Sequence, residues 1–132
     1  MAFIHYGSVA VVTATGGAAT GRIVVPNGGL VLAVGYTKAS TDPFSNGVGL
    51  AVTVEETGPA VLALASGGSA MDATLVKYPH AQVHGNADGV ALTLDGTRTK
   101  TQPVPMGSNQ TLKFVVNAGG DAKNGTFWAL VG

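Results

Sequence analysis

Residues 48–54 read Val48-Gly49-Leu50-Ala51-Val52-Thr53-Val54, and this stretch decides the fold class. Its large apolar residues stand at every second position, with small or polar residues between them. Successive side chains of a β-strand point to opposite faces of a sheet, so the alternation predicts a half-buried strand. Such strands are typical of antiparallel sheets, because one face packs on a core while the other meets solvent.

Other stretches repeat this alternation and extend the prediction to the whole chain. Three of them carry the apolar sets Leu30, Leu32, Val34 and Tyr36; Val90, Leu92 and Leu94; and Leu112, Phe114 and Val116. Four further strands are expected at Ser8–Thr15, Thr20–Val25, Pro59–Ala65 and Thr126–Val131. Glycine-rich turns such as Asn27-Gly28-Gly29 separate them at short intervals. We therefore expect an all-β protein, an antiparallel β-sandwich or jelly-roll-like barrel of about eight short strands.

The length of the chain and the absence of a linker indicate its domain organisation. The chain has 132 residues, which suits one domain able to bury a core without disulfides or metals. No linker or internal repeat divides it, so residues 8–132 are expected to form a single β-sandwich domain. Residues 1–7 precede the first expected strand and form an N-terminal segment that could dock on a partner. The alternative is that its apolar residues start the first strand and pack on their own core.

The charge content limits the possible partners. Seven basic and seven acidic residues give a net charge of zero, and only 11% of residues are charged. No basic stripe is present to contact a phosphate backbone, so we expect no nucleic-acid binding. A surface this poor in charge protects a monomer badly from association, which predicts that a partner covers part of it.

Compartment and membrane association are also constrained. The start of the chain lacks the basic residues and long apolar run of a signal peptide, and the apolar stretches elsewhere are too short to span a bilayer. The chain has no cysteine, which fits a reducing compartment. We therefore expect neither secretion by that route nor a membrane partner.

No pattern of catalytic or metal-binding residues stands out. His80 and His84 are four residues apart, but on an extended chain that spacing separates them by about 13 Å, too far to share one ion. The adjacent Glu55 and Glu56 face opposite sides of a strand and cannot flank one substrate. No serine lies in a nucleophile motif. We expect no enzymatic activity, no cofactor and no metal.

The candidate partner-binding residues are aromatic, apolar or imidazole side chains near the chain start, in two long connections and in the last strand. The connections are the polar segment 40–46 and the stretch 66–88, because loops of that length often contact a neighbour. Trp128 follows Phe127 in the last strand, so one ring should face the core and the other outward, to anchor an interface or stack on a sugar. The candidates are Phe3, Ile4, Tyr6, Phe44, Tyr78, His80, His84 and Trp128.

Several stretches resemble a family of small tailed-bacteriophage structural proteins that are commonly found beside the major capsid protein. The matching stretches are Tyr78–His84 and Asn117–Gly132, and the pair Thr20–Val24 and Leu32–Tyr36 fits as well. The sequence departs from the family at Trp128, where the family has a smaller or imidazole side chain. The resemblance covers nearly the whole chain through strand and turn patterns.

The resemblance implies a virion component, in the first place a capsid decoration or cement protein that stabilises the phage head. The implied partners are the major capsid protein and further copies of the chain, as a homotrimer. The implied location is the capsid exterior, after synthesis in the host cytoplasm. Two alternatives remain open: a tail or baseplate component, and a carbohydrate-binding β-sandwich module.

Overall fold

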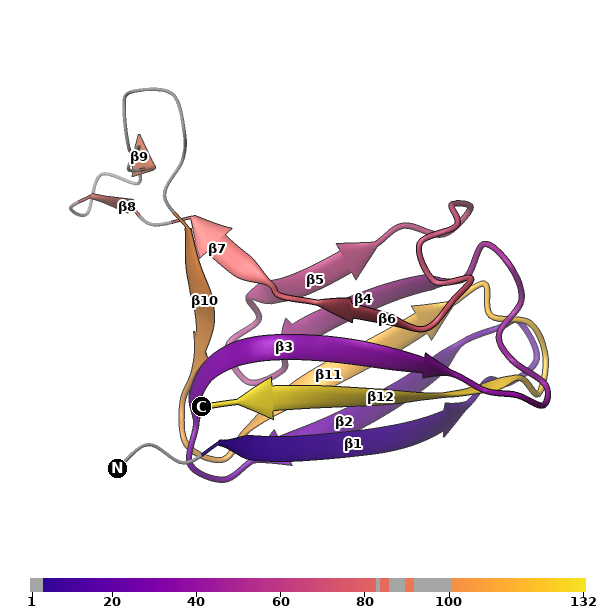
Figure 1. Cartoon of the computed structure of the whole chain (residues 1–132), viewed down its shortest axis with the longest axis horizontal. Coiled ribbons are helices and arrows are strands. Elements are labelled where there is room, and N and C mark those ends of the chain that lie inside the picture. Colours follow the sequence, from indigo (N-terminus) through magenta and orange to yellow (C-terminus); the bar gives the residue numbers. More distant parts are fainter. Residues whose placement is uncertain (1–3, 83, 86–89, 92–100) are drawn as a thin grey trace.

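The protein is an all-β sandwich, as the alternation predicts. The structure, a computed structural model, describes residues 4–82, 84–85, 90–91 and 101–132. Within these residues no helix forms, and two antiparallel sheets pack face to face without closing into a barrel (Figure 1). The sandwich, rather than the barrel alternative, is therefore the confirmed architecture.

The first sheet has the strand order β1-β12-β3-β10-β7, and β6 pairs with β3 beside this path. Its strands are β1 (His5–Val12), β12 (Asn124–Val131), β3 (Gly29–Lys38), β10 (Thr101–Met106), β7 (His80–Gln82) and β6 (Leu75–Lys77). The second sheet has the order β2-β11-β4-β5, with β2 (Ala19–Val25), β11 (Gln110–Asn117), β4 (Gly49–Val54) and β5 (Ala60–Leu64). A separate short pair consists of β8 (His84–Gly85) and β9 (Val90–Ala91).

The core lies between the two sheets, where the predicted alternating faces meet. The core-facing apolar residues of β4 and β11, together with Val48 just before β4, are at most 2% exposed: Val48, Leu50, Val52, Val54, Leu112, Phe114 and Val116. Phe127 of β12 faces them from the first sheet and stacks on Phe114, with ring centroids 5.2 Å apart. Tyr36 and Phe44 complete this aromatic cluster.

Replacing Leu50 with alanine should lower the free energy of unfolding by about 2–5 kcal/mol, because a buried side chain is lost and a cavity remains. Leu50 is 2% exposed and lies in β4 between β5 and β11. Thr53→Ala is the control, since Thr53 lies on the opposite face of the same strand and is only partly buried. Urea denaturation measures both. A loss below about 0.5 kcal/mol for Leu50→Ala would contradict the placement of this strand.

One alternating set does not share a face as the sequence indicates. In β3, Val34 and Tyr36 point into the core, whereas Leu30 and Leu32 are 42% and 37% exposed. The pairing of β12 with β3 shifts register between Leu130 and Val131, so β3 carries an extra residue there. A bulge of this kind reverses the side to which the following side chains point.

The long connection at 66–88 is also more ordered than expected. β6 and β7 lie within it, and β6 extends the first sheet by pairing with β3 at Val34–Tyr36. β10 first pairs with β7 at 101–103 and then pairs with the same strand, β3, at Gly29–Val31 (Figure 1). A strand at 101–106 was not expected, because prolines at 103 and 105 cannot donate to a β-ladder.

The chain enters the sandwich earlier than the sequence indicates. β1 begins at His5 rather than at Ser8, and Tyr6 already pairs with Leu130 of β12. Residues 5–7 are therefore part of the sandwich, and the expected boundary between segment 1–7 and domain 8–132 is corrected to before His5. Ile4 is the only described residue that precedes the first strand.

Candidate interaction face

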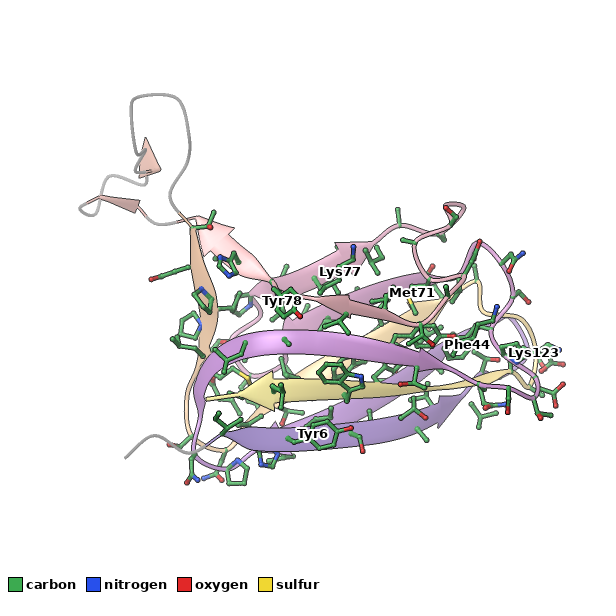
Figure 2. The ribbon with its side chains drawn as sticks, viewed as in Figure 1. Tyr6, Phe44, Met71, Lys77, Tyr78 and Lys123 are labelled. Carbon is green, nitrogen blue, oxygen red and sulfur yellow. The ribbon has the colours of Figure 1, made fainter. Side chains whose placement is uncertain are left out.

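The outer side of the first sheet gathers large apolar side chains that are partly or largely exposed in the described chain. Cross-strand register aligns Ser8, Trp128, Gly35 and Val76 across β1, β12, β3 and β6. Because strand side chains alternate, the other outward positions follow from this row, except in β3, where the bulge turns Leu30 and Leu32 outward. We define the apolar face by six outward side chains: Tyr6, Leu30, Leu32, Val76, Trp128 and Leu130. Figure 2 views this side of the molecule, with Tyr6 on β1.

Trp128 lies flat on the sheet at the centre of the apolar face. A Cβ atom added to Gly35, its neighbour on β3, would overlap the indole ring, so the ring occupies the space that a side chain would take. The ring of Tyr6 lies beside it, with centroids 6.1 Å apart and planes tilted by 31°. Only glycine at position 35 allows this arrangement, which gives the middle of the face a low, continuous aromatic surface.

Exposure at the apolar face is high for side chains of this size. Tyr6 is 60% exposed and Val76 is 42% exposed. Ile4 and Tyr78, at the rim, are 68% and 70% exposed. Among the described residues, all but one of the exposed large apolar side chains belong to the first sheet or its flanking residues. The exception is Val24 of β2, on the outer side of the second sheet.

The apolar face carries no charge among its described residues. Its other outward positions hold Ser8, Ala10, Val12, Ala33, Thr37, Asn124 and Thr126. Lys77 pairs with Val34, which faces the core, so Lys77 belongs to the other side of the sheet edge. The rim toward Ser8, Thr37 and Thr126 is therefore polar but uncharged.

The outer side of the second sheet is different, because it carries an ion pair and hydrogen bonds to a second carboxylate. Nε of Arg22 donates to a carboxylate oxygen of Glu55 at 2.9 Å, and Lys113 is the cross-strand neighbour of Arg22. The backbone N–H and hydroxyl of Thr111 donate to the carboxylate of Glu56 at 2.7 and 2.9 Å. The backbone hydrogen bond from Thr111 lowers the pKa of Glu56 below its usual value. This side of the sandwich is thus a charged, solvated surface.

The structure brings together three of the predicted partner-binding residues. Tyr6 and Trp128 meet on the apolar face, and Ile4 flanks it at Gly132. Tyr78 lies just beyond β6, two residues after Val76. His80 lies apart from them in β7, where its Nδ1 is 3.1 Å from Oγ1 of Thr101. His84 is in β8, and Phe3 lies outside the described residues.

The prediction for Phe44 is wrong. Its ring is 4% exposed and stacks on Tyr36 with centroids 5.7 Å apart, so it belongs to the core. The segment around it folds back onto the sandwich, where the backbone N–H of Ser45 donates to the carbonyl of Gly119. A polar segment that carries one aromatic residue is ambiguous in sequence, because the same ring can anchor the segment to its own domain.

Four members of the apolar face were not identified from the sequence: Leu30, Leu32, Val76 and Leu130. Leu30 and Leu32 were expected in the core with Val34 and Tyr36, and only the bulge turns them outward. Val76 lies in a segment read as a loop. Leu130 shares the outward side of β12 with Trp128, so the outward prediction for Trp128 could have found it.

Two absences within the described residues concern metal ions and membranes. No three histidine, cysteine, aspartate or glutamate side chains come close enough together to hold a metal ion. No helix there has the length and apolar character needed to cross a membrane.

Comparison with protein-family models, with curated proteins and with solved structures finds no match to this chain. The resemblance to tailed-phage structural proteins therefore stays a prediction from the residues quoted above.

Proposed function

We propose that the chain is a non-enzymatic structural protein of a virus particle, acting as a decoration protein on the capsid exterior that stabilises the head. The observation that carries this proposal is the contrast between the two outer sides of the sandwich. One is charged and solvated, while the other is an uncharged apolar face. Contiguous apolar surface on a small protein marks an interaction site.

A symmetric particle suits such a protein for a physical reason. Many copies on a lattice make each weak contact effectively intramolecular, so modest apolar contacts suffice for stable attachment. With a net charge of zero, long-range electrostatic steering contributes little, and contact area has to provide the affinity. The proposed partners are the major capsid protein and further copies of the chain in a homotrimer. No cofactor, nucleic acid or membrane takes part.

The segment that precedes β1 is proposed to dock on the capsid. Ile4 is 68% exposed at the start of the described chain, outside the hydrogen-bonded ladder of β1. Apolar residues at a chain end stay ordered only when something ties them down. A capsid surface would provide that tie in the assembled particle.

Deleting residues 2–4 should abolish binding to undecorated particles while leaving the fold intact, because β1 begins at His5. Cosedimentation with particles measures binding, and quantified gel bands give the copy number. The full-length protein should approach the abundance of the capsid protein. Thermal unfolding of the truncated protein should match that of the full chain.

Three outcomes would contradict parts of this proposal. A truncated protein that still binds at full occupancy removes the docking role of the segment. A copy number far below that of the capsid protein indicates a tail or baseplate component. The aromatic pair Tyr6–Trp128 could also stack on a pyranose ring, as in carbohydrate-binding sandwiches. Saccharide-dependent change in Trp128 fluorescence, without particle binding, would favour that module instead.

A further inference from the structure

The end strands of the two sheets differ in how well they are protected against pairing with another strand. β1 is an end strand of the first sheet, and β2 and β5 are the end strands of the second sheet (Figure 1). Edge strands are usually protected by charge, by a bulge or by short length. β2 carries Arg22, the pairing of β5 with β4 shifts register at Val52–Thr53, and β7, at the other end of the first sheet, has three residues.

β1 has none of these protections. Its eight residues, His5–Val12, pair one for one with β12 (Asn124–Val131) without a register shift. They include no aspartate, glutamate, lysine, arginine or proline. A long, regular and uncharged edge of this kind is a template for the addition of another strand.

Every second residue of β1 directs its backbone N–H and C=O groups away from β12. In an antiparallel pair, the hydrogen-bonded positions alternate along each strand. The N–H of Thr13, just after β1, donates to the carbonyl of Lys123 at 2.8 Å, so the odd-numbered residues of β1 bond to β12. The even-numbered residues face the free edge, and within the described chain their backbone groups form no hydrogen bond: Tyr6, Ser8, Ala10 and Val12.

The side chains along this edge are also incompletely covered. Tyr6 and Val12 point to the outer side of the sheet and are 60% and 66% exposed. On the inner side Val11 is buried, whereas Val9 packs against the core but is only partly buried. Side chains of an added strand would be cross-strand neighbours of these residues and would cover them. An added strand therefore gains backbone hydrogen bonds and apolar contacts together.

A second copy of β1 is a poor occupant of the edge. Antiparallel pairing of two β1 edges places a two-fold axis perpendicular to the sheet, so both apolar faces come to lie on the same side. The faces would then join into one larger apolar patch that still meets solvent. A segment of a different protein avoids this, because the partner that supplies the strand also lies beside Tyr6, where the apolar face begins.

We propose that the free edge of β1 is a strand-addition site that takes up an extended, uncharged segment of a partner protein. The segment extends the first sheet by one strand, with main-chain hydrogen bonds to Ser8 and Ala10 and apolar side chains beside Tyr6 and Val12. This inference goes beyond the decoration role and does not depend on it, because a peptide tests the edge in solution.

Hydrogen exchange of the protein alone tests whether the edge is open. The amides of Ser8 and Ala10 should exchange about a hundredfold or more faster than those of Val9 and Val11, which bond to β12. Equal protection of all four amides would overturn the inference, since the edge would then already be occupied.

The second test adds a probe peptide of alternating threonine and valine, kept soluble by two lysines at each end. Binding should slow the exchange of the Ser8 and Ala10 amides about tenfold or more and leave those of Val9 and Val11 unchanged. Ala10→Pro should abolish peptide binding, because proline removes an N–H that faces the free edge and places its ring there. Ala10→Thr is the matched control, since it keeps the N–H and should bind the peptide like the unsubstituted protein. Thermal unfolding should show both variants folded.

Three results of the peptide test would overturn the inference. They are unchanged exchange of the Ser8 amide on adding the peptide, equal peptide binding by the two Ala10 variants, or protection of Ser8 on raising the protein concentration without peptide, which assigns the edge to a second copy. Particle binding separates this inference from the proposed function. A protein that binds the peptide and ignores particles refutes the decoration role alone, whereas one that decorates particles without binding the peptide refutes the strand-addition site alone.

Discussion

Replacing Phe127 with alanine should lower the free energy of unfolding by about 3–5 kcal/mol. The Phe127 side chain is fully buried and joins three parts of the fold. Its ring centroid lies 5.2 Å from Phe114 of the second sheet, 5.4 Å from Tyr36 of β3 and 6.2 Å from Phe44 of the segment after β3. Truncation removes all three contacts and leaves a cavity that rigid strands on both sides cannot fill.

Thr126→Ala is the matched control, because Thr126 precedes Phe127 in β12 and points to the outer side of the sheet. Equilibrium urea denaturation should show a change below about 1 kcal/mol for this variant. A loss of similar size for both substitutions would mean that the strand, rather than the aromatic cluster, is responsible. An almost neutral Phe127→Ala would contradict the cluster as the link between the sheets.

The fold class was predictable because simple alternation governs the strands that make the core. In β4 from Leu50 and in β11 from Leu112, every second residue is buried, and the pair Phe127-Trp128 divides between core and surface as its adjacency indicates. These strands are central, with neighbours on both sides, and the extra residues at their irregular pairings lie in the partner strands β3 and β5. Here the face assigned from sequence is the face observed.

Where strand pairing is irregular, the alternation pattern assigned side chains to the wrong side of the sheet. The bulge at Leu32–Ala33 has no marker in the sequence, because neither glycine nor proline stands there. Leu30 and Leu32 therefore read as core residues together with Val34 and Tyr36. The register shift is a property of two paired strands and is not visible in either one alone.

The same reasoning explains which residues of the apolar face could be predicted from the sequence. Tyr6 and Trp128 were identified because large aromatic residues near a chain end and in an alternating strand are conspicuous. Their meeting at 6.1 Å depends on β1 pairing with β12, a contact between opposite ends of the chain. Val76 was missed because its three-residue strand forms only by pairing with β3. Long-range pairing of this kind is set by the whole fold.

Gly28→Ala should lower the free energy of unfolding by about 2–5 kcal/mol, through backbone strain and overpacking together. Gly28 has a φ of +66° in the turn between β2 and β3. A Cβ atom there would lie 2.6 Å from the carbonyl oxygen of Met106 and 2.7 Å from the carbonyl carbon of Gly107. Both are backbone atoms, so no side chain can rotate away to relieve the overlap.

Gly58→Ala separates the two contributions, because Gly58 has a φ of +87° but nothing within 4 Å of an added Cβ. In this control only the left-handed backbone strain lowers the free energy of unfolding, by about 1–2 kcal/mol. Thermal or urea unfolding should therefore rank Gly28→Ala well below Gly58→Ala in stability. Equal losses would show that the β2–β3 turn and the strand end at Met106 can move apart freely. That result would also weaken the case for a fixed apolar face, since β3 leaves this turn through Leu30 and carries two of its six residues, Leu30 and Leu32.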